Sequence, residues 1–283
     1  MEGGEMDALA RDEVPDEAPD RASGGADDGV AVAAQDLVRL YPRPGGGVLR
    51  AVDGVSLTIR AGEVFALLGP NGAGKTTTLE ILEGLGRPTS GRVTVLGLDV
   101  ERHRREVKQR IGVQLQAATY FEHLTLREIL VLFGSFHRAR RDPDDLLAMV
   151  GLGEKRDALV GQLSGGQAQR FSIVAALAGD PEVVFLDEPT TGLDPQARRG
   201  LWDLIRTVNR EGCTIVLTTH NMEEAEVLAD RVAIMDRGRI VALDTPAGHI
   251  RALGPVPRRV PREPTSATLE DVFLALTGHH LRD

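Results

Sequence analysis

The sequence feature that most constrains the fold is the stretch GPNGAGKTT at residues 69 to 77. It follows VFALLG at 64 to 69, a short apolar run typical of a strand buried on both faces, and it precedes a run that fits a helix. A glycine-rich turn in this context, with Lys-Thr behind the last glycine, is the pattern of a phosphate-binding loop. A plain glycine turn would not require Lys75 and Thr76 at that place.

The loop predicts an ATP site with defined contacts. Its glycines let backbone N–H groups converge on phosphates, and the N-terminus of the following helix adds its dipole. We expect Lys75 to reach the β- and γ-phosphates and the Thr76 hydroxyl to ligate Mg²⁺. The expected ATP-binding residues of the loop are Gly69, Pro70, Asn71, Gly72, Ala73, Gly74, Lys75, Thr76 and Thr77.

A second apolar run, VVFLDE at 183 to 188, ends in two carboxylates. Asp187, at the end of a buried strand, is expected beside the loop and in the Mg²⁺ shell. Glu188 is expected next to the γ-phosphate, where a carboxylate orients and polarises the attacking water. Asp-Glu after a strand is common, and it gains its meaning from the phosphate-binding loop in the same chain.

Two aromatic residues complete the expected site. His220 ends TIVLTTH at 214 to 220, and the carboxyl ends of strands in one sheet meet in one crevice. A lone histidine at a strand end is more often structural, but this placement favours a contact with the γ-phosphate, which makes Lys75, Glu188 and His220 the expected catalytic residues. Tyr41, in the turn-rich YPRPGGG at 41 to 47, is expected to stack on adenine.

The chain carries a second candidate anion site in QLSGGQAQR, at 162 to 170. Ser164 is a plausible N-cap, and Gly165 and Gly166 expose backbone N–H groups at a helix start. Because the first loop already surrounds the phosphates, the second should face another molecule. A two-fold dimer is the simplest arrangement, with Ser164, Gly165, Gly166 and Gln167 capping the γ-phosphate of the partner's ATP. An ordinary glycine-rich helix start is the alternative.

The expected fold is α/β, with a P-loop ATPase core and a mainly parallel sheet, because strands alternate with helices. We expect an N-terminal antiparallel β subdomain and an inserted helical signature subdomain at about 114 to 178. The core should span 30–253. Residues 1–29 read as a disordered acidic tail, and 254–283 as a proline-rich linker followed by a helix.

The composition narrows the class of protein. Residues 1 to 29 hold ten acidic side chains and two arginines, and the rest of the chain is nearly neutral, so nothing indicates a nucleic-acid partner. No apolar run reaches the ~20 residues of a membrane span, and no secretory signal is apparent. The one cysteine excludes an internal disulfide. These features predict a cytoplasmic chain.

In order and spacing, GPNGAGKTT, Gln116, LSGGQ, VVFLDEP, GLD and His220 resemble the ATP-binding-cassette (ABC) ATPases over roughly residues 33 to 250. The resemblance implies that Gln116 is the switch-loop glutamine, which binds ATP and the metal ion and contacts the membrane subunits, although Gln114 could take that place. It implies that Asp194 communicates across a homodimer. IGVQLQ, GLDPQARRGLWDLI and EPTSATLEDVFLALTG resemble the drug- and antibiotic-exporting, daunorubicin-resistance branch.

The resemblance implies an ATP-hydrolysing exporter subunit that works with a separate integral membrane permease and lies on the inner face of the membrane. The segment from Gln116 to Phe136, with Tyr120 and Phe121 expected on the surface, is the candidate docking region. A non-transport ABC ATPase and an importer subunit are the alternatives. One cassette without a coiled-coil insertion disfavours the first, and the branch-like segments disfavour the second.

Overall fold

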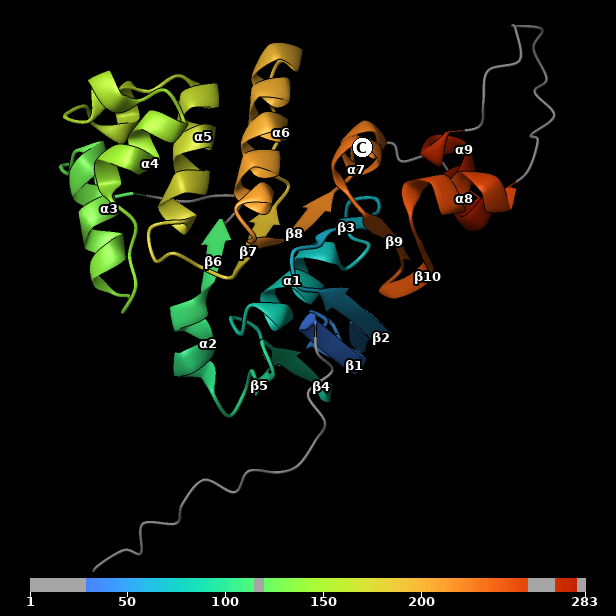
Figure 1. Cartoon of the computed structure of the whole chain (residues 1–283). Helices are drawn as coiled ribbons and strands as arrows, with labels where there is room; N and C mark the ends of the chain where they lie inside the picture. Colours follow the sequence, from blue (N-terminus) through green and yellow to red (C-terminus); the bar gives the residue numbers. More distant parts are fainter. Residues whose placement is uncertain (1–28, 115–119, 254–267, 279–283) are drawn as a thin grey trace, which may run out of the picture.

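The computed structural model describes residues 29–114, 120–253 and 268–278. The acidic segment 1–28, Gln116 and the whole proline-rich stretch 254–264 lie outside these residues. The chain forms two sheets and a group of helices, and α1 (Lys75–Leu82), which follows the glycine-rich loop, lies between the sheets (Figure 1).

The larger sheet is mainly parallel, which confirms the predicted fold class. Its strand order is β10-β9-β3-β8-β7-β6, and only β10 runs antiparallel, in a hairpin with β9 around Arg237 and Gly238. The strands are β3 (Val64–Leu68), β6 (Ile111–Gln114), β7 (Val183–Asp187), β8 (Thr214–Thr219), β9 (Arg231–Asp236) and β10 (Arg239–Asp244). Because β3, β7 and β8 are parallel neighbours, their carboxyl ends meet at one edge.

The smaller sheet is antiparallel, as predicted for the N-terminal part. Its order is β2-β1-β4-β5, formed by β1 (Val30–Pro42), β2 (Val48–Arg60), β4 (Ser90–Val95) and β5 (Leu98–Asp99). One local expectation was wrong. Tyr41 does not lie in the turn but inside β1, where it pairs with Leu49, and the turn begins after Pro42.

Helices α3 to α5 form a separate group beside the parallel sheet, and α6 stands next to them (Figure 1). The helices are α1 (Lys75–Leu82), α2 (Arg104–Arg110), α3 (Leu126–Ser135), α4 (Pro143–Met149), α5 (Gly165–Ala176), α6 (Pro195–Arg210), α7 (Met222–Leu228), α8 (Pro246–Leu253) and α9 (Leu269–Thr277). The helical segment begins later than expected, since Gln114 belongs to β6. Residues 155–163, KRDALVGQL, form no α-helix. They contain the 3₁₀ turn η2 (Val160–Gln162) and the end of η1 (Gly153–Lys155).

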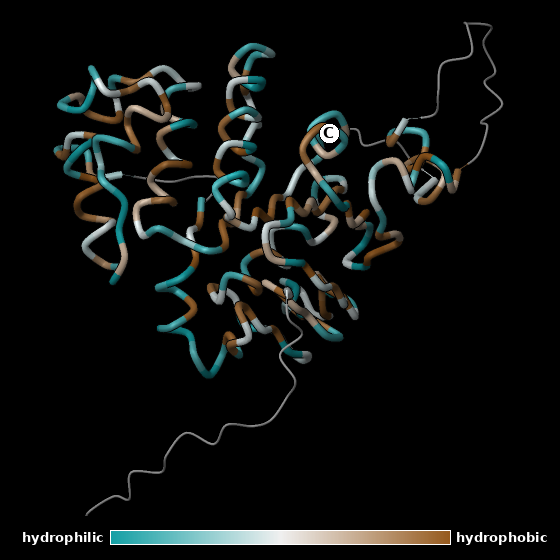
Figure 2. The backbone as a smooth tube through the Cα atoms, viewed as in Figure 1, coloured by the Kyte–Doolittle hydropathy of each residue, from teal (hydrophilic) through white to brown (hydrophobic). Residues whose placement is uncertain are grey.

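The parallel sheet is buried on both faces, and this explains its continuous apolar strands. In β3, Phe65 and Leu67 pack in the cluster shared with the antiparallel sheet and α1. Ala66 and Leu68 pack in the opposite cluster, with the helices of the α3 to α6 group and α7. Successive side chains of a strand point to opposite faces, so one short strand supplies both cores. The apolar residues accordingly concentrate in the strands and inner helix faces (Figure 2).

Helix α9 packs on this chain, against α7 and α8. A capping box of Thr268 and Asp271 begins this helix. Leu269 and Phe273 are buried in the core, whereas Leu276 is 47% exposed. Among the described helices, none is both long and apolar enough to cross a membrane.

Candidate functional site

The glycine-rich loop leaves the carboxyl end of β3 and enters α1 at Lys75. Gly74 has a φ of 99°, and a Cβ there would collide with the carbonyl oxygen of Ala51 on β2. Only glycine fits such a position without strain. The β9–β10 hairpin also holds the loop, since Gly238 N–H donates to the Ala73 carbonyl at 2.9 Å.

The Lys75 ammonium is held inside the loop, and its residue is 4% exposed. Its Nζ donates to the carbonyls of Gly69 at 2.9 Å and Pro70 at 3.1 Å. It also lies 3.2 Å from Glu188 Oε1. A compact ammonium with three donors satisfies this set of oxygens.

Asp187 and Thr76 are brought together across the loop. Thr76 Oγ1 lies 3.2 Å from both carboxylate oxygens of Asp187, and the Thr218 hydroxyl donates to Asp187 Oδ1 at 2.5 Å. Hydroxyl and carboxylate oxygens are the ligands that Mg²⁺ prefers, so these residues fit the expected ion. The third expected ligand, Gln116, lies outside the described residues. The sequence did not single out Thr218, because nothing in TIVLTTH distinguishes it from its neighbours.

Glu188 is held in an unusual backbone conformation, with a φ of 47°. Its N–H donates to the Thr218 carbonyl at 3.2 Å and to the Thr218 hydroxyl at 3.0 Å. Its Oε2 accepts the Thr191 hydroxyl at 3.0 Å and lies 3.0 Å from His220 Nδ1. Strained residues of this kind concentrate at functional sites.

The charge of Glu188 is set by opposing effects. Burial raises its pKa, but the positive charge of Lys75 and the interaction with His220 outweigh burial, and the pKa lies below its ordinary value. The carboxylate is therefore ionised at neutral pH and available as a proton acceptor.

A cavity of about 520 Å³ lies over the loop. The predicted residues that line it are Tyr41, Asn71, Gly72, Gly74, Lys75, Thr76, Thr77 and Glu188. The Arg39 guanidinium stacks 4.5 Å from the centre of the Tyr41 ring. Sequence reasoning missed the arginines Arg43, Arg50 and Arg237, which line the same cavity. Arg43 and Arg237 lie in turns, and Arg50 lies on β2.

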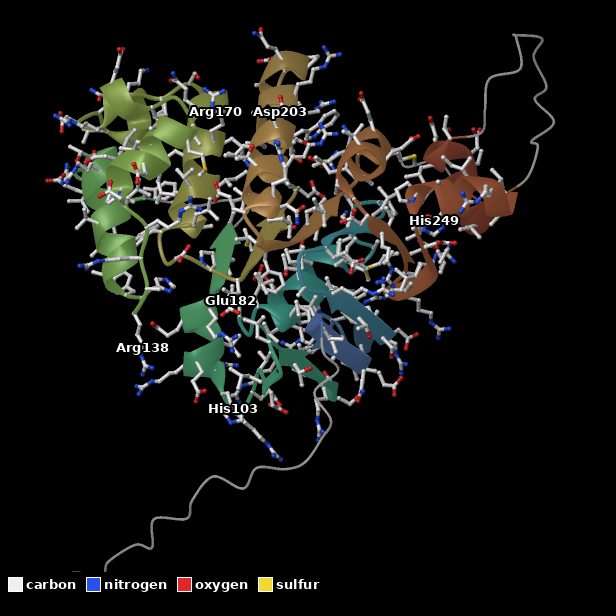
Figure 3. The ribbon with its side chains drawn as sticks, in the orientation of Figure 1. His103, Arg138, Arg170, Glu182, Asp203 and His249 are labelled. Atoms are coloured by element: carbon white, nitrogen blue, oxygen red, sulfur yellow. The ribbon has the colours of Figure 1, made fainter. Side chains whose placement is uncertain are left out.

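Ser164, Gly165, Gly166 and Gln167, which we call the signature residues, form a different surface. Ser164 caps α5 in a capping box with Gln167, and the hollow there is about 680 Å³, lined by Ser164, Gly165, Gly166, Gln167 and Asp194 among others. Helices α5, with Arg170, and α6, with Asp203, are neighbours (Figure 3). None of these signature residues lines the cavity over the loop of the same chain.

Asp194 has a clear local role as the N-cap of α6. Its Oδ1 accepts the N–H groups of Gln196 and Ala197, both at 2.9 Å. The residue therefore stands at the turn between β7 and α6, beside the signature surface.

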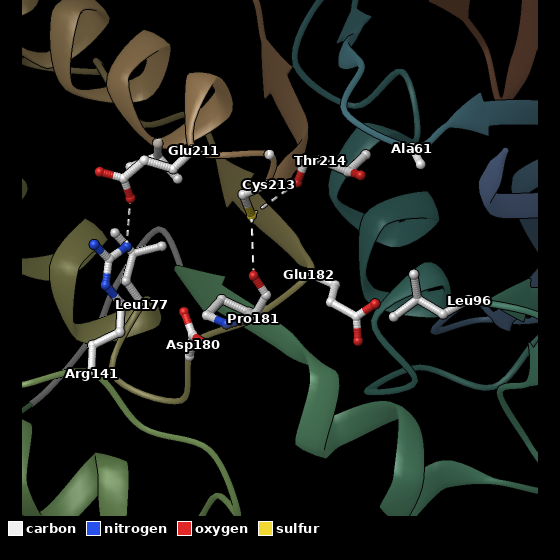
Figure 4. A pocket seen from close by; sticks show the side chains of 12 residues that line it. Ala61, Leu96, Arg141, Leu177, Asp180, Pro181, Glu182, Glu211, Cys213 and Thr214 are labelled. Atoms are coloured by element: carbon white, nitrogen blue, oxygen red, sulfur yellow. Dashed lines mark hydrogen bonds and ion pairs between the residues drawn. The ribbon is translucent and has the colours of Figure 1, made fainter.

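Another hollow, of about 430 Å³, lies at the amino ends of β7 and β8 (Figure 4). There Cys213 Sγ donates to the Pro181 carbonyl at 3.4 Å, and Arg141 pairs with Glu211 at 2.8 Å. Burial raises the pKa of the Cys213 thiol to about 12, so the thiol is unreactive at neutral pH. The hollow contains none of the predicted site residues.

Tyr120 and Phe121, the two aromatic residues expected on the docking surface, differ in their exposure. Phe121 is 58% exposed. Tyr120 was expected on the surface, but its ring packs 5.4 Å from that of Phe171 and 6.1 Å from that of Phe133. Burial raises the pKa of Tyr120 to about 12. This part of the expectation was wrong because Phe171, far along the chain, covers the ring.

Comparison with known proteins identifies the family. Residues 52–191 match the family described as ABC transporter. The daunorubicin resistance ATP-binding protein DrrA2 of Streptomyces coeruleorubidus is 46% identical over 80% of this chain and 70% of its own length. The Nod factor export ATP-binding protein I of Burkholderia lata is 42% identical, over 81% of this chain and 77% of its own.

Solved structures agree with this assignment. The ATP-binding subunit of an ABC transporter superposes with a TM-score of 0.74 at 26% identity and covers 87% of this chain and 99% of its own. A dimeric ATP-binding cassette bound to ADP and Pi, in a post-hydrolysis state, gives 0.68 at 26% identity, over 76% and 98%. The chain belongs to the ABC transporter family, as an ATP-hydrolysing ATP-binding protein of the branch that contains the daunorubicin-resistance proteins.

Proposed function

We propose that this chain powers efflux of a small hydrophobic compound, such as a drug or antibiotic, through a separate membrane permease, and that it acts as a Mg²⁺-dependent homodimer on the inner face of the membrane. The observation that carries the proposal is the meeting of Lys75, Glu188 and His220 at the carboxyl ends of neighbouring parallel strands. The relatives' names supply the direction of transport.

The proposed roles follow from the geometry. The loop N–H groups and Lys75 bind the phosphates, and Tyr41 presents the ring face opposite Arg39 to the adenine. Glu188 orients the attacking water and accepts its proton, and His220 stabilises the γ-phosphate. Thr76, Asp187 and Gln116 would hold Mg²⁺, and a bound ion there would supply neutralisation of the charge on the phosphates.

The signature surface supports the dimer. Ser164, Gly165 and Gly166 start α5 away from this chain's own cavity. In a two-fold dimer they would cap the γ-phosphate bound by the partner, and the Asp194 turn would lie at the same interface. The dimeric cassettes among the structural neighbours are consistent with this arrangement.

Co-purification tests whether the chain binds a membrane permease, as we propose. The tagged chain is recovered from gently solubilised native membranes, both as wild type and as Phe121→Asp. A multi-span membrane protein in stoichiometric amount, lost or reduced with the variant, is expected. Recovery of an importer permease would change the direction of transport. Recovery of only ribosomal or DNA-bound partners would overturn the transporter function and leave the ATPase.

A further inference from the structure

One buried carboxyl group lies between the segments that form the proposed site. Glu224, on α7, has 0% of its surface exposed. Glu223 and Glu226 on the same helix are exposed. Burial of a carboxyl group is unfavourable unless hydrogen-bond donors surround it, so the contacts of Glu224 show what this position constrains.

Groups from three segments lie at this carboxyl group. Trp202 Nε1, on α6, donates to Glu224 Oε1 at 3.2 Å. The hydroxyls of Thr190 and Thr219, both buried, lie beside the carboxyl group and favour its ionised form, while Glu224 Oε2 has no hydrogen-bond partner among the described residues. Burial raises the pKa of Glu224, and the neighbouring groups of Thr219, Thr190 and Trp202, with a smaller effect of Arg198, act against burial. The carboxyl group thus joins α6, the turn after β7 and the end of β8.

The two threonines continue directly into the proposed site. The Thr219 carbonyl accepts the N–H of Gly69, the first glycine of the loop, at 3.2 Å, and His220 is the next residue. The Thr190 carbonyl accepts the N–H of Leu193 at 3.2 Å, inside the turn that leads to α6. Glu224 therefore connects the dimer-facing turn to the strand end that carries His220.

We propose that Glu224 is a positioning residue for ATP hydrolysis, which holds the turn after β7 and the end of β8 in one arrangement. The inference rests on the proposed roles of His220 and the Asp194 turn. A displacement of about 1 Å at a catalytic group costs on the order of 100-fold in rate. ATP binding depends on the loop and Lys75 instead, so loss of the carboxyl group acts on kcat and not on KM.

The test replaces the carboxyl group without removing its volume. Glu224→Met puts an apolar side chain of similar size in the buried site and leaves the Trp202 N–H without its acceptor, so the variant should lose some stability. At a temperature where both chains are fully folded, we expect kcat to fall at least about tenfold with KM for MgATP close to wild type. Glu224→Gln keeps an acceptor oxygen and the shape, and it should restore most of the rate.

A buried carboxylate at the opposite end of the sheet provides the control. Glu63 is 6% exposed and pairs with Arg231 at 3.2 Å, at the amino end of β3. Glu63→Met breaks this pair and should lower the unfolding midpoint while kcat stays near wild type. A structural role for Glu224 would instead make the two variants behave alike.

Trp202 supplies a readout besides activity, because it is the one tryptophan in the chain. Its indole N–H donates to Glu224, so MgATP should change its fluorescence in wild type and much less in Glu224→Met. A second variant, Trp202→Phe, keeps an aromatic ring and removes the donor; it should lower kcat in the same direction.

The outcomes separate this inference from the proposed function. A wild-type chain that does not hydrolyse ATP refutes the catalytic roles on which both rest. A wild-type chain that hydrolyses ATP, with kcat unchanged in both Glu224→Met and Trp202→Phe, refutes the positioning role alone. If Glu224→Met does not fold, an unchanged kcat in Trp202→Phe overturns the inference and a lowered kcat supports it.

Discussion

Lys75 and Glu188 form a buried ion pair across the ATP cavity, with Nζ 3.2 Å from Oε1 and both side chains less than a tenth exposed. The Lys75 ammonium, which we propose binds phosphate, and the Glu188 carboxylate, which we propose is the catalytic base, thus neutralise each other's charge. A γ-phosphate competes with the Glu188 carboxylate for the same ammonium. The pair therefore links phosphate binding to the release of the base.

The first prediction concerns Glu188→Gln. An amide cannot accept the proton of the attacking water, so we expect kcat to fall at least about 100-fold. The amide also competes less for Lys75, so ATP should bind more tightly and an ATP-bound dimer should accumulate, measured by fluorescence titration and size-exclusion chromatography. Glu182→Gln, at the exposed amino edge of the same strand, is the control and should hydrolyse ATP normally. Hydrolysis near the wild-type rate in Glu188→Gln would refute its role as the base.

The second prediction concerns Thr218, whose hydroxyl donates to Asp187 and accepts the Glu188 N–H. Thr218→Val keeps the shape and removes both hydrogen bonds. Loss of a partner that orients a metal ligand weakens metal binding about 10- to 100-fold, so the Mg²⁺ concentration for half-maximal hydrolysis should rise by that order. Thr214→Val is the matched control, since Thr214 is buried at the amino end of the same strand and its hydroxyl accepts the Gly62 N–H at 3.0 Å. An unchanged Mg²⁺ requirement in Thr218→Val would show that Asp187 needs no such support.

The third prediction concerns Ser164→Ala, which removes the capping hydroxyl of α5. Helix stability should fall by about 1 kcal/mol. If the signature binds the partner's ATP, steady-state hydrolysis should fall far more than this, whereas ATP binding to the isolated chain, measured by equilibrium titration, stays unchanged. Thr268→Ala removes the same type of cap from α9 and is the control. Equal effects of the two substitutions on hydrolysis would show that Ser164 acts only as a helix cap.

The sequence predicted the parts of the site that lie next to one another in the chain. The loop, Asp187 and Glu188 each follow a short apolar run, and a buried parallel strand leads its next residues to the carboxyl edge of the sheet. Strand order was not needed for that prediction. The residue types alone led to the predicted roles, metal binding for Asp187 and orientation of the attacking water for Glu188.

Residues defined by packing between distant segments were not predictable. Glu224 is one of three glutamates in MEEAEV, and only its position opposite Trp202 and Thr190 separates it from its exposed neighbours. Tyr120 was misjudged for the same reason, because its burial depends on Phe171. Periodicity fixes which face of a helix is apolar, but not which polar residue on that face meets donors from elsewhere.

The last prediction is a pH dependence of stability caused by Glu83, which ends α1 and is 1% exposed. Burial, with smaller effects of Asp187 and Glu80, raises the pKa of Glu83 from 4.5 to about 8. Between these two values the folded chain keeps a proton that the unfolded chain has lost. The free energy of unfolding should therefore decrease as pH rises through this window, by at most about 1.4 kcal/mol per pH unit.

Glu83→Gln removes this titration. We expect the variant to gain stability over wild type as pH rises from 5 to about 8, with no further gain above that, in urea unfolding experiments with EDTA present. Glu106→Gln, at an exposed position on α2, should follow the wild-type curve. A stability difference that is the same at every pH would mean that Glu83 is ionised in the folded chain, and that the interior beneath Asp187 tolerates a second negative charge.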